Sequence, residues 1–154
     1  MEIESFVRNW KWVHTMTVHF AKAVPDDKWD FTPDRRRFGP FCRQLRHIVR
    51  GRGVYTAAML TKKADWSSSG EHYNGPLTRD ALLLAIDEKQ QEFLATLPTV
   101  DVEVPIYYGE TAFTFDNFLC EMIQHESIHH GQWSVYAALG GFETPRSWQT
   151  GWKL

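Results

Sequence analysis

Residues 123–133 read I-Q-H-E-S-I-H-H-G-Q-W, and the five letters from His125 to His129 spell H-E-x-x-H. This spelling is the signature of a large class of zinc peptidases, in which the glutamate acts as general base on a zinc-bound water. A peptidase also needs a third ligand and a sheet that holds the peptide. Glu143 is the nearest downstream carboxylate, and no segment before the motif has the pattern of such a sheet. The context therefore argues against a peptidase.

The motif lies within a longer helical pattern. Its members recur at steps of 4, 3, 4, 3, 4 and 3 residues: Phe118, Met122, His125, His129, Gln132, Tyr136 and Leu139. This spacing predicts a helix that begins near Thr114 or Asp116 and is stopped by Gly140 and Gly141. His125 and His129 lie in its core-facing stripe, whereas Glu126 and His130 point about 100° away from it. Two imidazoles on one apolar face need hydrogen-bond partners or a shared cation, so the pair predicts a metal site.

A third metal ligand must come from elsewhere in the chain. The remaining histidines are His14, His19, His47, His72 and His130. His72 lies in a polar loop and is expected in solvent, and His14 and His19 only flank the apolar stripe of the first predicted helix. His47 lies in L-R-H-I-V on the second predicted helix, and Gly51 follows it on the same face and would leave room for an ion and a substrate. Spacing alone favours His47 without deciding the choice.

Apolar periodicity predicts three further helices, at residues 3–24, about 41–63 and 78–98, with Thr78 as the N-cap of the third. The first carries Ile3, Phe6, Trp10, Val13, Thr17, Phe20 and Val24 in one stripe. Residues 99–113 alternate around Gly109, which predicts a short hairpin or an extended crossover. The pattern predicts an all-α fold, a four-helix bundle with a long connection, in a single domain that spans residues 1–154.

The composition of the chain limits the classes of protein to which it can belong. The 154 residues are 43% hydrophobic and 23% charged, which is typical of a globular chain. A net charge of -2 argues against a dedicated nucleic-acid binder. No run approaches the roughly 18 apolar residues of a membrane span, and the start M-E-I-E-S-F lacks the positive charge of a signal peptide, so we expect a cytoplasmic protein. The two cysteines are expected to be buried free thiols.

The helix order, together with L-R-H-I-V and H-E-S-I-H-H-G-Q, resembles the DinB-like superfamily of DinB/YfiT-type metalloenzymes. The second stretch is similar to the family's H-x-x-x-H-x-G-Q ending. The resemblance implies a four-helix bundle with metal ligands at His47, His125 and His129. Family members often carry arginine where His130 stands. Three histidines and no fourth protein ligand imply an open, catalytic type of site for a divalent metal ion, with zinc or nickel favoured and iron or manganese also compatible.

The resemblance implies a function as well. Characterised members are thiol-dependent S-transferases or isomerases that use a low-molecular-weight thiol, so the expected partners are a small-molecule thiol and a small electrophile. The family also implies a homodimer, with neither nucleic acid nor membrane as partner. A non-catalytic metal-binding module of a stress response is the alternative. A third hypothesis is a structural bundle whose histidines bond to one another.

Two further features remain open at this stage. Seven of the ten arginines lie between residues 35 and 52: Arg35, Arg36, Arg37, Arg43, Arg46, Arg50 and Arg52. Of these, Arg43, Arg46 and Arg50 form a stripe that is either a solvated helix face or a collar that attracts an anionic substrate. The C-terminal Trp148 and Trp152 are expected to pack over an end of the bundle or across a subunit boundary.

Overall fold

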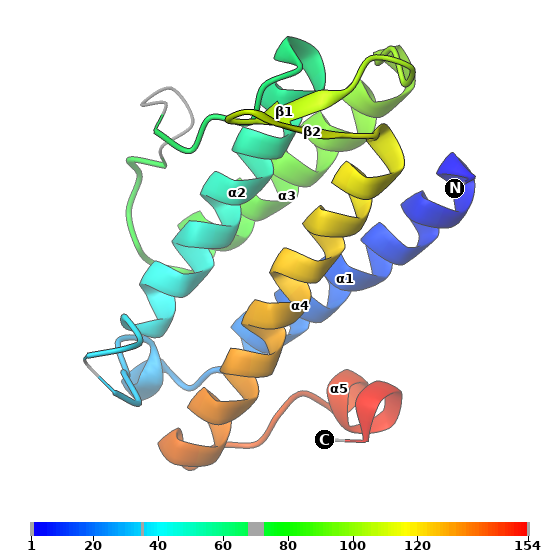
Figure 1. The fold of residues 1–154 in the computed structure, drawn as a ribbon. Coiled ribbons are helices and arrows are strands. Elements are labelled where there is room, and N and C mark those ends of the chain that lie inside the picture. Colours follow the sequence, from blue (N-terminus) through cyan, green and yellow to red (C-terminus); the bar gives the residue numbers. More distant parts are fainter. Residues whose placement is uncertain (1, 35, 68–72, 154) are drawn as a thin grey trace.

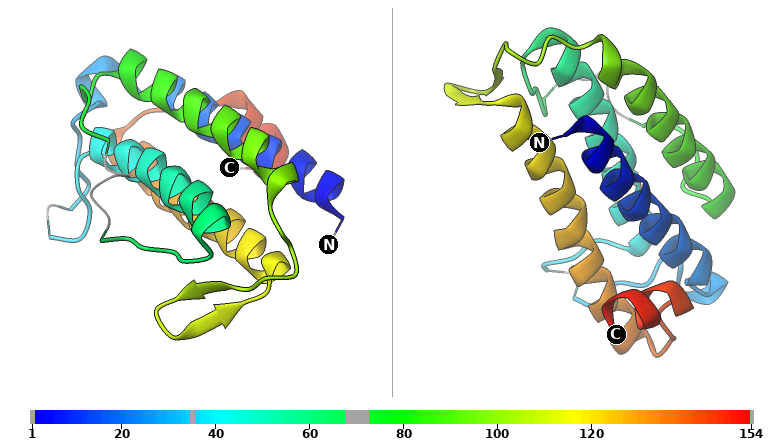
Figure 2. Two further views of the ribbon diagram at one scale, coloured as in Figure 1. Left: turned by 90° about the horizontal axis from the view of Figure 1, so that it is seen from above. Right: turned by 90° about the vertical axis from the view of Figure 1, so that its right-hand side faces the viewer.

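Four long helices form the body of the molecule, and the predicted bundle is confirmed (Figure 1). The computed structural model describes residues 2–34, 36–67 and 73–153, and the statements below concern these residues. The helices are α1 (Ile3–Ala23), α2 (Phe41–Thr61), α3 (Arg79–Thr96) and α4 (Phe115–Gly140). The helix α4 packs against both α1 and α2, and α3 packs against α1 and α2 from the other side (Figure 2). Two adjacent faces of α4 are therefore in contact with the bundle.

The interior is divided into two apolar clusters. One surrounds Phe20, Phe41 and Trp133, and the other surrounds Trp10 and Phe93. The predicted stripe of α1 is buried from Phe6 to Val24, but Ile3 is 41% exposed because it lies in the first turn, beyond the core. On α4 the predicted stripe fails at its last member, Leu139, which is 64% exposed.

The connection between α3 and α4 contains a hairpin, which decides between the two predicted conformations. The strands β1 (Ile106–Tyr108) and β2 (Thr111–Phe113) are antiparallel, with Tyr107 opposite Ala112. Gly109 makes the turn with a φ of 58°, a left-handed conformation that glycine adopts without steric cost. The hairpin is tied to the chain after α2, because the N–H of Ala64 donates to the carbonyl of Tyr107 at 2.8 Å.

The C-terminal segment forms a further short helix, α5 (Arg146–Trp152), against one end of α1 and α4 (Figures 1 and 2). The indole N–H of Trp148 donates to the carbonyl of Met16 at 3.0 Å, and its ring lies 4.6 Å from that of Phe20. Trp148 therefore packs over an end of its own bundle, as one of the two alternatives predicted, while Trp152 is exposed.

The structure also bears on the expectations about the two cysteines and about membrane-spanning helices. Cys42 is buried as expected, but Cys120 is exposed, because it lies on the outer side of α4. Among the described helices, none combines the length and apolar character needed to span a bilayer.

Candidate metal centre

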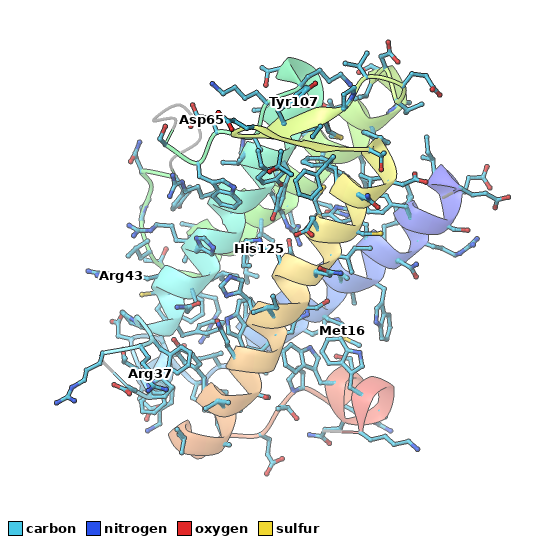
Figure 3. The ribbon with its side chains drawn as sticks, viewed as in Figure 1. Met16, Arg37, Arg43, Asp65, Tyr107 and His125 are labelled. Atoms are coloured by element: carbon cyan, nitrogen blue, oxygen red, sulfur yellow. The ribbon has the colours of Figure 1, made fainter. Side chains whose placement is uncertain are left out.

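Three histidines from two helices bring their Nε2 atoms together. His47 comes from α2, and His125 and His129 come from α4, one turn apart. Nε2 of His125 lies 3.0 Å from that of His47 and 3.2 Å from that of His129. Figure 3 shows His125 between α2 and α4. Within the described ranges, this is the only group of three or more potential metal-ligating side chains.

The two nitrogen–nitrogen distances from His125 fit ligands on one ion, and the three ligand atoms all lie within 4.8 Å of one another. Donors about 2.1 Å from a common ion lie about 3.0 Å apart at right angles and about 3.4 Å apart in a tetrahedron. Without a cation, the Nε2 of His125 carries either one proton or one lone pair. It can therefore form only one good hydrogen bond, although the Nε2 atoms of both His47 and His129 lie within contact distance. A cation engages all three lone pairs. The donor set therefore fits a divalent metal ion better than it fits mutual hydrogen bonding.

The surroundings keep these histidines neutral. Burial lowers the pKa of His125 to about 4, with a further contribution from His47. Burial also lowers the pKa of His129 to about 4, and His125 and His47 add to this effect. The pKa of His47 is lowered by burial and by the charge of Arg50. At neutral pH the imidazole lone pairs are therefore free of protons, which is the form that binds metals.

Aromatic rings and a glycine shape the inner side of the cluster. The ring of Trp66 stacks on His47 at 5.9 Å and meets the edge of His125 at 5.6 Å. A Cβ at Gly51 would lie 3.3 Å from Cε1 of His125. Gly51 leaves space beside α2, as the sequence predicts, but the rings of His125 and Trp66 occupy that space. Trp66 was missed in the sequence because it lies in a loop without periodicity.

On the outer side of the cluster, His47 lines a small basic pocket of about 230 Å³. Its lining residues are Arg43, Arg46, His47, Arg50, Tyr73 and Asn74. Arg43 and Arg46 are exposed, and Arg50 donates through Nη2 to the carbonyl of Trp66. The predicted arginine stripe therefore shares this pocket with His47, one of the three clustered histidines.

The remaining described histidines have other partners. His14 contacts Arg52 and Asp87, and His19 contacts Ser147. His72 and Arg35, which entered the sequence analysis, lie outside the described residues. Of the candidates that spacing left open, the structure brings only His47 to the pair on α4.

Comparison with known proteins places this arrangement in a family. The model of the DinB family matches residues 1–150. The chain belongs to the DinB family. The solved structure of a DinB-like protein, YjoA from Bacillus subtilis, superposes on this DinB protein with a TM-score of 0.72 over 92% of this chain and 95% of that chain. The identity is 15%, so this likeness concerns the fold. No curated protein matches the chain significantly in sequence.

The DinB motif has a second buried face that the sequence analysis did not predict. Glu126 and His130 lie off the predicted stripe, yet both are buried, with Glu126 only 1% exposed. The reason is that α4 is covered on two faces, and the face with Glu126 and His130 turns toward α1, where Thr17 contacts both. A second periodic stripe marks this face in the sequence: Phe115, Leu119, Met122, Glu126, His130, Trp133 and Ala137.

Arg52 also differs from the basic residues around it. It was counted with the seven arginines of residues 35–52, yet its side chain is 0% exposed and lies inside the bundle. It forms an ion pair with Glu126, with 2.7 Å between Nε and Oε1. A buried arginine needs such a partner, because an unpaired charge in an apolar interior is strongly unfavourable.

Proposed function

We propose that this DinB protein is a metal-dependent enzyme whose single divalent ion is bound by His47, His125 and His129. The observation that supports this proposal is the convergence of three neutral Nε2 atoms, at 3.0 and 3.2 Å from one to the next. Three neutral ligands leave coordination positions for water or substrate, as in catalytic rather than structural sites. Zinc or nickel suits imidazole best, and iron or manganese is compatible.

We further propose that the reaction is a thiol-dependent S-transfer or isomerisation of a small electrophile. The family resemblance suggests the thiol, and the site chemistry is compatible with it. Because all three ligands are neutral, the charge of the ion is not offset by them, and a bound ion favours the thiolate form of a thiol. The arginines at the pocket mouth add positive charge, and a pocket of about 230 Å³ suits a small molecule.

Metal analysis of protein purified without a histidine tag is the first test. We expect close to one divalent ion per chain, removed by a chelator. His47→Ala, His125→Ala and His129→Ala should each lose most of the bound metal. His19→Ala, which removes an exposed histidine bonded to Ser147, should retain it. Full metal content in the three cluster variants would refute the proposed site.

A second test separates an enzyme from a non-catalytic metal-binding module. The consumption of a low-molecular-weight thiol and a small electrophile is followed with metal-loaded and chelated protein. An enzyme shows turnover that requires the metal and is lost in His125→Ala. Tight metal binding with no turnover and no effect of added thiol on the spectrum of bound cobalt would favour the module.

A further inference from the structure

Two fully buried charges link the two helices that carry the histidine cluster. Arg52 of α2 is 0% exposed and Glu126 of α4 is 1% exposed. The pair is bidentate, because Arg52 Nε donates to Oε1 at 2.7 Å and Nη2 donates to Oε2 at 2.9 Å. Apolar packing has no preferred direction, whereas a bidentate arginine–carboxylate pair fixes both distance and orientation.

Groups from the other helices complete the network around this pair. Thr17 of α1 donates to Oε2 of Glu126 at 3.0 Å. Nη1 of Arg52 donates to Nδ1 of His14 at 2.8 Å and to Oε1 of Gln90 at 3.3 Å. Burial alone would raise the pKa of Glu126, but the charge and hydrogen bonds of Arg52 outweigh it, so the pKa is lowered and Glu126 is ionised. All four long helices therefore contribute to one polar layer.

This layer lies directly beside the histidine cluster. Glu126 follows His125 in the chain, so their side chains leave α4 about 100° apart. One points into the network and the other into the cluster. Any rotation of α4 about its axis that separates Glu126 from Arg52 also moves His125 and His129 relative to His47. A rotation of about 20° displaces a group about 6 Å from the helix axis by about 2 Å, which is comparable to a metal–nitrogen bond.

We infer that Arg52 and Glu126 are positioning residues that set the rotation of α4 against α2 and thereby hold His125 and His129 toward His47. This inference rests on the proposed metal site. It gives the glutamate of H-E-x-x-H a place inside the bundle, away from the open side of the cluster. A role in stability alone would leave metal affinity unchanged once the fold is preserved, and this difference can be measured.

The informative variant removes both charges at once. Breaking a buried ion pair on one side leaves an unpaired charge and is strongly destabilising, whereas replacing both members with apolar residues of similar volume is often neutral. Arg52→Met combined with Glu126→Leu should therefore fold. We expect this double variant to keep the helical content of the wild type but to bind Co²⁺ 10- to 100-fold more weakly, which is the range for lost supporting contacts.

The measurement is a titration of metal-free protein with Co²⁺, followed by visible absorption and by competition with a chelator. Lys89→Met combined with Glu92→Leu is the matched control, since it removes an exposed ion pair on α3. Leu82→Ala, at a fully buried position of α3, controls for lost stability without a change in the network. Both controls should bind Co²⁺ as the wild type does.

The possible outcomes are distinct. Wild-type Co²⁺ affinity and spectrum in the double variant would overturn the inference, and failure of the wild type to bind Co²⁺ would overturn the proposed metal site instead. Arg52→Lys keeps the buried positive charge but not the bidentate geometry. It decides the question if the double variant does not fold: several-fold weaker Co²⁺ binding supports the inference, and unchanged binding overturns it.

Discussion

At the scale of single residues, Gly51 shows how closely the inner side of the cluster is packed. A Cβ there would lie 3.3 Å from Cε1 of His125 and 3.5 Å from the ring of Trp66. We expect Gly51→Val to displace the His125 ring and to weaken metal binding about 10-fold or more, comparable to the loss of a supporting contact. Overpacking should also lower the free energy of unfolding by about 1–3 kcal/mol. Calorimetric titration with Zn²⁺ and thermal unfolding measure both effects.

Gly131 offers a matched control on α4. A Cβ at Gly131 has no heavy atom within 4 Å in the described structure. Gly131→Ala should therefore raise the free energy of unfolding by about 0.5–1 kcal/mol through helix propensity and leave metal affinity unchanged. Equal Zn²⁺ affinity in Gly51→Val and Gly131→Ala would show that the space at Gly51 does not matter for the site.

His14 predicts a pH dependence of stability. Burial, followed by the charge of Arg52, lowers the pKa of His14 to about 4 from an ordinary value near 6.5. Because the folded pKa is below the unfolded one, the unfolded chain binds a proton first as the pH falls, and unfolding becomes more favourable. The loss begins near pH 6.5 and is complete near pH 4. Its size for this side chain, 20% exposed, is on the order of 2–3 kcal/mol.

The variant His14→Gln isolates this contribution from those of the other histidines. A glutamine can still accept from Arg52 through its amide oxygen, but it does not titrate. Urea unfolding at several pH values between 4 and 7 should therefore show a shallower acid loss in His14→Gln than in the wild type. Identical pH profiles would mean that His14 titrates alike in the folded and unfolded states.

At the scale of elements, the two N-caps of α4 and α3 differ although both are threonine. The side chain of Thr114 accepts from the backbone N–H of Asn117 at 3.3 Å, whereas Thr78 makes no such bond. Thr114→Ala should lower the free energy of unfolding by about 0.5–2 kcal/mol, and Thr78→Ala should have a smaller effect. Chemical unfolding of both variants tests this, and a larger loss in Thr78→Ala would contradict it.

Helix positions could be predicted because apolar periodicity is a local property. Thr78 and Thr114 do begin helices, and Gly141 ends α4 in a left-handed conformation with a φ of 71°. The convergence of His47 with His125 and His129 was predictable only by adding the family resemblance to this periodicity. Spacing along a helix defines a face but does not say which neighbouring helix the face meets.

The buried polar layer shows where this kind of prediction stops. On α2 the stripe of Leu45, Ile48, Tyr55 and Met59 leaves a gap that Arg52 fills, yet an arginine in such a gap is more often solvated. Its burial depends on Glu126, which lies 74 residues away in the chain. Similarly, α4 has two buried faces because it lies between two helices. The second face does have a periodic stripe in the sequence, but Glu126 and His130 in its middle are polar, so the stripe alone does not predict that they are buried. Pairing of charges across helices is a tertiary property.

At the scale of the whole molecule, charge is distributed unevenly. The net charge is -2, but three arginines line the pocket that His47 also lines. A positive rim on a slightly acidic molecule raises the local concentration of small anions at that site. Figure 3 shows Arg43 on the outer side of α2 and Arg37 in the preceding loop, so the basic residues fall into a pocket group and a loop group.

These two groups permit a test at constant net charge. Arg46→Gln combined with Arg50→Gln removes two charges from the pocket, and Arg36→Gln combined with Arg37→Gln removes two from the exposed loop, so both variants change the net charge from -2 to -4. We expect the pocket variant to bind an anionic thiol several-fold more weakly, with metal content and folding intact, and the loop variant to bind as the wild type does.

The difference in thiol affinity between the two variants should shrink at high salt, because exposed charges are screened over about 10 Å at 0.1 M ionic strength. Calorimetric titration of one thiol into all three metal-loaded proteins at low and high salt measures this. Equal affinities throughout would mean that the arginine stripe is a solvated helix face, and the metal ion alone would then have to account for the attraction of an anionic substrate.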